Sequence, residues 1–177
     1  LGVKARKGSL GSPYAIRDYR AVNPEYGTLD DLEELVDAIH EQGMKCIIDV
    51  VYNHTSPDSM LWETHPEWFY RSADGTPGNH VGDWTDIIDL DYAADASTAP
   101  GGLWDYQIET LVQWARIVDG FRCDVASEVP TDFWEKAFAD FRAQRPEDGL
   151  FFLAEAEKPE LQVNAFDAYY AWQHPVQ

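Results

Sequence analysis

Two acidic residues, Asp124 and Glu155, are the first candidates for chemistry in this sequence. Each follows an apolar run that predicts a buried strand, and one helical segment separates the two runs. Adjacent parallel strands lie about 4.8 Å apart, so side chains at their ends can bring two carboxyl groups to about 5 Å. That separation suits retaining glycoside hydrolysis, in which one carboxylate attacks the anomeric carbon and the other acid protonates the departing oxygen.

Arg122 suggests how the two acids divide these roles. It stands two residues before Asp124, so both side chains point to the same side of the strand, and its charge is expected to keep Asp124 ionised. Glu155 follows Phe152 and Leu153 and has no cation at the corresponding position, so we expect a raised pKa for Glu155. Other interpretations stay open, because an Arg-x-Asp pair is often a structural ion pair and a strand-end carboxylate can cap the next helix.

The segments around these residues alternate between predicted helices and strands. Helices are expected from Thr28 to Gly43, over 103–115 and over 131–144, and strands over 45–54, 117–125, 150–156 and within 165–172. The run 45–54 has no polar alternation, which predicts a strand buried on both faces. This order indicates a parallel sheet with crossover helices.

Residues at the strand ends favour a barrel over an open sheet. Asp49, Asp124 and Glu155 each fall near the carboxyl end of a different strand, and in a barrel these ends meet at one mouth. A nucleotide-binding sheet needs a glycine-rich turn after a strand, and the sequence has none. We therefore expect part of a (β/α)8 barrel.

Charge limits the classes of partner. The 177 residues include 13 Lys and Arg against 32 Asp and Glu, a formal net charge of -19, which repels phosphate backbones and anionic membranes. We therefore expect no nucleic-acid or membrane partner, whereas a neutral polysaccharide is not repelled. Cys46 and Cys123 lack metal-site spacing and are interpreted as small core residues.

Three short motifs resemble those of the α-amylase family of glycoside hydrolases: DVVYNH (49–54), GFRCDVAS (120–127) and FLAEAEK (152–158). They occur in the family's order and spacing, and SPYAIRDY (12–19) and IIDLDY (87–92) resemble two weaker family motifs. The resemblance implies a partial (β/α)8 TIM barrel, about strands three to six, with a small domain inserted after the third strand. Its expected parts are a barrel segment over 1–53, the inserted domain over 54–100 and a second barrel segment over 101–177.

The resemblance also implies roles for single residues. Asp124 matches the nucleophile, Glu155 the general acid/base and Arg122 the arginine that holds the nucleophile. His54 matches a histidine that hydrogen-bonds the sugar beside the cleaved bond, and Tyr14 a tyrosine that stacks under that sugar. From the residues alone, a buried histidine bonded to backbone and a tyrosine that packs its loop remain alternatives.

The same comparison implies supporting residues and a metal. Asp49 is expected to organise the mouth of the barrel. Asn53, Asp89 and Glu128 are candidate ligands for calcium, which prefers oxygen; Glu128 would serve through its backbone carbonyl. Ser127 and Glu128 stand where many α-amylases have Lys-His, which is a departure from the family pattern.

The expected activity is a retaining hydrolase that cleaves α-glucosidic bonds of starch-like glucans or maltooligosaccharides. Val125, where typical α-amylases have Ala, keeps an α-1,6-acting glucosidase open, and a transglycosylase or a non-catalytic carbohydrate-binding relative are further alternatives. The family's third carboxylate lies beyond Gln177, and both ends look cut, so we expect the isolated chain to be inactive and to associate. Family habit and the acidic surface favour an extracellular or periplasmic location.

Overall fold

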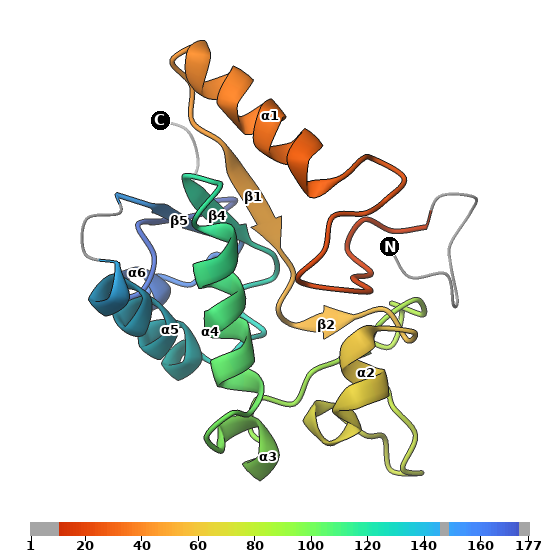
Figure 1. Cartoon of the computed structure of the whole chain (residues 1–177). Coiled ribbons are helices and arrows are strands. Elements are labelled where there is room, and N and C mark those ends of the chain that lie inside the picture. Colours follow the sequence, from red (N-terminus) through yellow and green to blue (C-terminus); the bar gives the residue numbers. More distant parts are fainter. Residues whose placement is uncertain (1–10, 146–148, 174–177) are drawn as a thin grey trace.

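The computed structural model describes residues 11–145 and 149–173, and its central feature is a four-stranded parallel sheet (Figure 1). The elements are, in chain order, α1 (Leu29–Glu41), β1 (Ile47–Val50), β2 (His54–Thr55), α2 (Met60–Thr64), the 3-10 helix η1 (Pro66–Trp68), β3 (Ile88–Asp89), α3 (Asp95–Thr98), α4 (Leu103–Trp114), β4 (Gly120–Cys123), α5 (Thr131–Gln144), β5 (Phe151–Ala154), α6 (Leu161–Asn164) and β6 (Ala168–Tyr169). This α/β arrangement of a parallel sheet with crossover helices agrees with the partial barrel that the sequence predicted.

Local signals explain where the helices begin. Thr28 caps α1: its side chain accepts a hydrogen bond from the backbone of Asp31, whose carboxylate accepts one from the backbone of Thr28. The helix ends at Glu41, just before Gly43, which has a φ of +74°. The prediction for α5 matches its bounds, and those for α1 and α4 match to within one or two residues.

The sheet has the strand order β1-β4-β5-β6, and every neighbouring pair is parallel. Asp49 pairs with Arg122, and Arg122 pairs with Leu153, so the strands that carry the candidate acids are direct neighbours. Gly120 opens β4 at a point where an added Cβ would lie 2.2 Å from the carbonyl oxygen of Phe151. Only glycine allows β4 and β5 to approach this closely.

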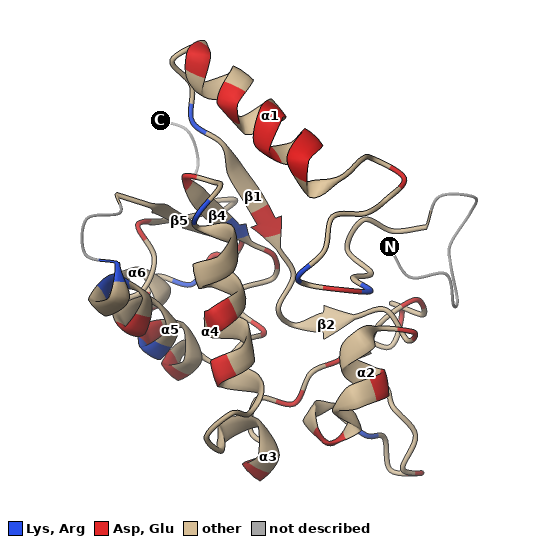
Figure 2. Cartoon of the chain, in the orientation of Figure 1, with Lys and Arg blue, Asp and Glu red and all other residues tan. Residues whose placement is uncertain are grey.

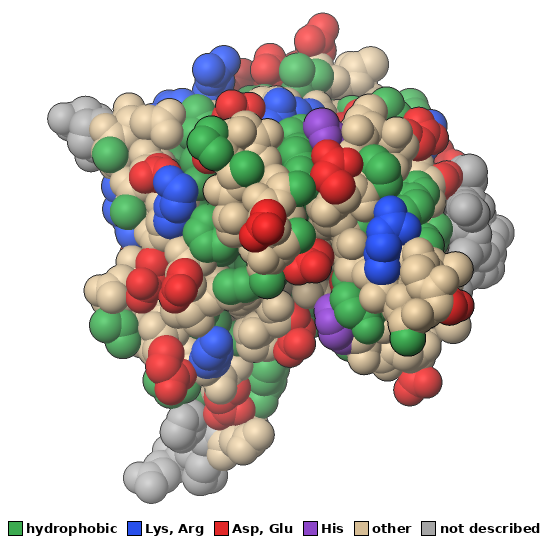
Figure 3. Space-filling model, turned by 90° about the horizontal axis from the view of Figure 1, so that it is seen from below, with side chains coloured by type: hydrophobic (Ala, Val, Ile, Leu, Met, Phe, Trp, Pro, Cys, Tyr) green, Lys and Arg blue, Asp and Glu red, His purple; other side chains and the backbone are tan. Residues whose placement is uncertain are grey.

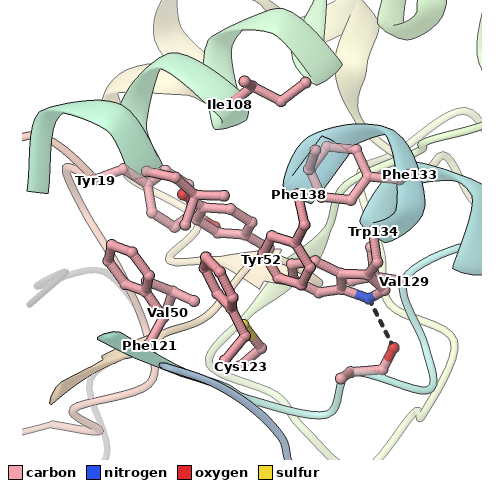
Figure 4. Packing of buried hydrophobic residues seen from close by; sticks show 14 of the residues in the cluster. Tyr19, Val50, Tyr52, Ile108, Phe121, Cys123, Val129, Phe133, Trp134 and Phe138 are labelled. Carbon is pink, nitrogen blue, oxygen red and sulfur yellow. Dashed lines mark hydrogen bonds between the residues drawn. The ribbon is translucent and has the colours of Figure 1, made fainter. Parts of the chain in front are cut away.

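One face of the sheet forms the core. Phe121 of β4 and Phe152 of β5 are buried, and Phe138 of α5 stacks on Phe152 with 4.1 Å between ring centroids. Helices α4 and α5 lie side by side over this face (Figures 1 and 4).

The opposite face of the sheet corrects one prediction. Residues 45–54 were expected to be buried on both faces, but the strand within them is only β1, and its Ile47 and Asp49 are exposed. The reason is that β1 is an edge strand, which pairs only with β4 in the described part of the chain. An apolar run shows that a strand can be buried, but its residues are buried only where another strand or helix covers them.

Residues 54–98 leave the parallel sheet. There β2 pairs with β3 in an antiparallel ladder that joins His54 to Asp89; α2 lies beside β2, whereas α3 packs at the start of α4 (Figure 1). The boundaries 53/54 and 100/101 of an inserted domain stay a prediction.

The surface carries the excess of negative charge. Acidic residues mark α1, α4 and α5 (Figure 2), and acidic and apolar side chains are interspersed over the face seen in Figure 3. Across residues 11–145 and 149–173, no helix has the length and apolar character needed to cross a membrane.

Candidate active site

Asp124 and Glu155 extend two neighbouring strands. The backbone N–H of Asp124 donates to Val50 at 2.9 Å, and that of Glu155 donates to Cys123 at 2.9 Å, so the parallel ladder continues through both residues. Both side chains line one pocket of about 390 Å³, within the size range of small-molecule sites. The structure therefore brings together the two acids that the sequence selected.

The loop after β4 is held from beneath by Trp134 of α5. The fully buried indole donates its Nε1 hydrogen to the carbonyl of Ala126 at 3.0 Å (Figure 4) and stacks on Tyr52 with 5.9 Å between centroids. Tyr52 in turn accepts, through its backbone carbonyl, a hydrogen bond of 2.8 Å from Tyr92. This aromatic layer fixes the backbone that follows Asp124.

Arg122 joins three carboxylates from three strands. Its Nη1 lies 2.7 Å from Asp49 and 2.9 Å from Asp124, and its Nη2 lies 2.6 Å from Glu155. Burial disfavours the charge of Arg122, but contacts with Asp49 and Tyr170 and the charge of Glu155 outweigh burial and raise its pKa. Glu155 has no cation two residues before it on its own strand, but Arg122 reaches it from the neighbouring strand.

The protonation of Asp124 also differs from the expectation. Its pKa is raised to about 7, first by burial and then by a hydrogen bond with Glu155 and that residue's charge; Arg122 opposes this rise but does not cancel it. Both carboxylates contact one guanidinium, so the charge of Glu155 adds to the cost of ionising Asp124.

Val125 helps to hold the carboxylate of Glu155 through an unusual backbone conformation. It has a φ of +37°, rare for a β-branched residue, and its N–H donates to Oε2 of Glu155 at 3.0 Å. Strain of this kind persists where surrounding structure enforces it, commonly at functional sites. The turn after Asp124 thus aims a backbone donor at Glu155.

Tyr14 and His54 line the same pocket. Tyr14 is 38% exposed, with the guanidinium of Arg122 5.8 Å from its ring centroid, and the charge of Asp49 is the main cause of its raised pKa. His54 is buried, faces the side-chain amide of Asn53 at 3.2 Å and hydrogen-bonds the backbone of Tyr14. Burial lowers the pKa of His54, which favours its neutral form. The sugar contacts of both residues stay predictions.

Asp49 contacts the cluster without lining the pocket. It hydrogen-bonds Arg122 from the exposed face of β1, and burial among its neighbours raises its pKa despite that cation. This location agrees with a role in organising the mouth of the barrel.

The remaining pocket walls were not identified from the sequence. They include Ser12, Trp84, Asp86 and Ile87. Asp86 directly precedes the IIDLDY motif and Ile87 begins it, so this motif was the sequence signal that could have identified both residues. Trp84 stands in a segment without periodicity, and nothing local distinguishes it from other tryptophans.

The calcium candidates Asn53, Asp89 and Glu128 stay a prediction. Asp89 is 1% exposed; one carboxylate oxygen accepts hydrogen bonds from His80 at 2.7 Å, and the other has no hydrogen-bond partner. Asn53 faces His54, and the carboxylate of Glu128 faces Ser127 at 3.3 Å. Over the described ranges no three His, Cys, Asp or Glu side chains are grouped to hold a metal ion. Calcium takes about six to eight oxygen ligands, which include backbone and amide carbonyls, so this search does not test the predicted set and we assign no step to a metal.

The raised pKa of Asp124 predicts a pH dependence of stability. Between its ordinary value of 3.8 and about 7, the folded protein binds more protons at this group than the unfolded chain does. The free energy of unfolding should therefore fall as pH rises through that range, by at most about 4 kcal/mol. Urea unfolding of the full-length protein at pH 4 and pH 8 measures this fall. Asp124→Asn cannot ionise and should show a smaller decrease; equal decreases in both proteins would contradict the raised pKa.

Known proteins share both the sequence and the fold of this chain. A family model described as "Alpha amylase, catalytic domain" matches residues 8–85. The crystal structure of an α-amylase from Lactobacillus plantarum superposes with a TM-score of 0.88 and 48% identity, over 98% of this chain and 43% of that one.

The chain belongs to the α-amylase family.

Other known proteins resemble the chain as well. A maltogenic α-amylase, AmyB from Thermotoga neapolitana, superposes with a TM-score of 0.82 and 40% identity, over 96% of this chain and 38% of that one. An α-1,4-glucan:maltose-1-phosphate maltosyltransferase from Arcanobacterium haemolyticum is 36% identical over 159 residues, which are 84% of this chain and 22% of that protein. The chain thus spans about a quarter or less of the length of the first curated relatives it matches.

Proposed function

We propose that this chain carries the nucleophile and the general acid/base of a retaining enzyme that cleaves α-glucosidic bonds in starch-like glucans or maltooligosaccharides. The observation that carries the proposal is the convergence of Asp124, Glu155 and Arg122 at one pocket from adjacent strand ends. Names of relatives support the substrate class, since they include α-amylases and a maltosyltransferase that uses an α-1,4-glucan.

The proposed reaction gives the two acids different roles. The glycosidic bond enters between the two carboxyl groups. Asp124 attacks the anomeric carbon as an ionised carboxylate, while Glu155 donates a proton to the departing oxygen. A covalent glycosyl ester forms on Asp124, and Glu155 next removes a proton from the acceptor that attacks this ester. Arg122 stays charged and stabilises whichever carboxylate is ionised.

A second candidate differs only in the acceptor. If a sugar hydroxyl replaces water in the second step, the same residues catalyse transglycosylation. The observation in its favour is the 36% identity to a maltosyltransferase. An α-1,6 linkage preference is a third possibility, based on Val125 beside the nucleophile.

Analysis of products decides between these reactions. The full-length protein is incubated with a maltooligosaccharide, and proton NMR follows the anomeric form of the first product together with chain lengths. We expect an α-configured reducing sugar, which indicates retention, and shorter products, which indicate hydrolysis. Products longer than the substrate would favour transglycosylation. A β-configured first product would contradict double displacement, and folded protein without turnover on α-1,4 or α-1,6 substrates would favour a binding role.

A further inference from the structure

Trp84 forms a wall of the pocket that holds Asp124 and Glu155. Its side chain is half-buried, whereas Trp68 of the same segment is 3% exposed and belongs to the core. The edge of the Trp84 ring meets His54 at 5.5 Å between centroids, with an interplanar angle of 61°. A large aromatic surface thus remains open toward the carboxylates without contributing to the core.

The loop that carries Trp84 is built to hold it in place. The side chain of Asn79 donates to the carbonyl of Trp84 at 2.9 Å and accepts from the backbone of Gly82 at 2.6 Å. Gly82 has a φ of +67°, which lets the chain turn between them. The loop is also anchored to β3, because both the backbone and the ring of His80 bond to buried Asp89 at 2.7 Å.

Trp84 is not needed to orient His54. The imidazole already contacts the amide of Asn53 and the backbone of Tyr14. The contacts that hold His54 therefore do not depend on the indole of Trp84 alone.

We propose that Trp84 is a specificity-determining residue that packs against a glucosyl ring of the substrate beside the cleaved bond. The inference rests on the proposed function. A flat apolar ring complements the C–H face of a pyranose, while Asp86 and the acids supply polar contacts around it, the usual division of labour in such pockets. Trp84 contacts substrate before and during the reaction, so it should affect KM more than kcat.

Binding to an inactive background tests the assignment. The full-length Asp124→Asn protein is titrated with maltotriose, and Kd is measured by calorimetry and by the change in tryptophan fluorescence. Adding Trp84→Ala or Trp84→Leu should raise Kd about tenfold, the scale of a lost aromatic contact, and remove most of the fluorescence change. Leucine keeps an apolar cover over His54 but has no flat face, so it separates substrate packing from a covering role.

Trp62→Ala is the matched control, since Trp62 packs on Phe69 and Arg71 and does not line the pocket. Its Kd should stay within about twofold, and thermal melts confirm that each variant folds. An unchanged Kd in Trp84→Leu, or in folded Trp84→Ala, overturns the role of Trp84.

Turnover by the protein with Asp124 intact distinguishes failure of the Trp84 assignment from failure of the proposed function. If that protein cleaves maltooligosaccharides while the Trp84 variants keep their affinity and KM, only the Trp84 assignment fails. If that protein neither binds nor cleaves α-1,4 or α-1,6 glucans, the proposed function fails, and the assignment of Trp84 fails with it.

Discussion

Asp124→Asn in the full-length protein should lower kcat on maltooligosaccharides by a factor of about 10⁴ or more, because the amide cannot form the glycosyl ester. The substitution keeps the size of the side chain and its place beside Arg122, so the fold should persist. Initial rates with a chromogenic maltooligosaccharide measure the effect.

Asp49→Asn is the matched control for Asp124→Asn. It makes the same chemical change on another partner of Arg122, at 2.7 Å, but Asp49 does not line the pocket. We expect a loss of no more than about a hundredfold, as for a residue that acts through another. Equal losses in both variants would mean that Asp124 acts through Arg122 and not as the nucleophile.

Chemical rescue gives a second test of the nucleophile. Asp124→Gly opens space at the anomeric carbon, and added azide should then attack it from the vacated side. With an activated α-glucosyl substrate, the product expected is a β-glucosyl azide, detected by NMR. Rescue without a glucosyl azide would contradict the assignment.

Arg122→Gln should produce the second large effect, a loss of about 3 kcal/mol in the free energy of unfolding at pH 8. The variant leaves three carboxylates close together without the cation that they share, at a site where Arg122 is 14% exposed. Repulsion among the three carboxylates should also weaken catalysis. Without the cation they would take up protons more readily, so Asp124 would be ionised less often. Urea unfolding and the pH dependence of kcat measure the two effects.

Lys136→Gln controls for the loss of a charge. Lys136 pairs with Asp140 one turn away on the exposed side of α5, where such a pair is worth about 0.5 kcal/mol or less. Arg122→Lys is the complementary variant, since a single ammonium cannot span all three acids. If Arg122→Gln costs no more than Lys136→Gln, the guanidinium does not organise the site.

Much of the fold could be predicted because its signals are local. The capping box at Thr28 and the periodicity of α5 depend on residues three or four positions apart. The strands were predicted too long: 117–125 contains only β4, and 45–54 contains only β1 and β2. An apolar run continues into the loops beyond a strand, while the ladder ends where the partner strand turns away.

Four residues that line the pocket were selected from the sequence, but their electrostatics were not predicted. Strand-end positions select Asp124 and Glu155, and the family resemblance adds Tyr14 and His54. The shared contact with Arg122 follows from side-chain reach across strands, and the raised pKa of Asp124 follows from burial that only packing creates. The place of Trp84 in the pocket wall depends on the path of an aperiodic loop, and no local sequence pattern predicts that path.

The three ion pairs of Arg122 also limit which substitutions this sequence can accept. Neutralising one of its three acids alters the ionisation of the other two, so substitutions at Asp49, Asp124 and Glu155 should be strongly non-additive. A change at Asp49 or Arg122 is then expected to be tolerated best beside a compensating change at the other. Libraries that sample these two positions one at a time would miss such pairs.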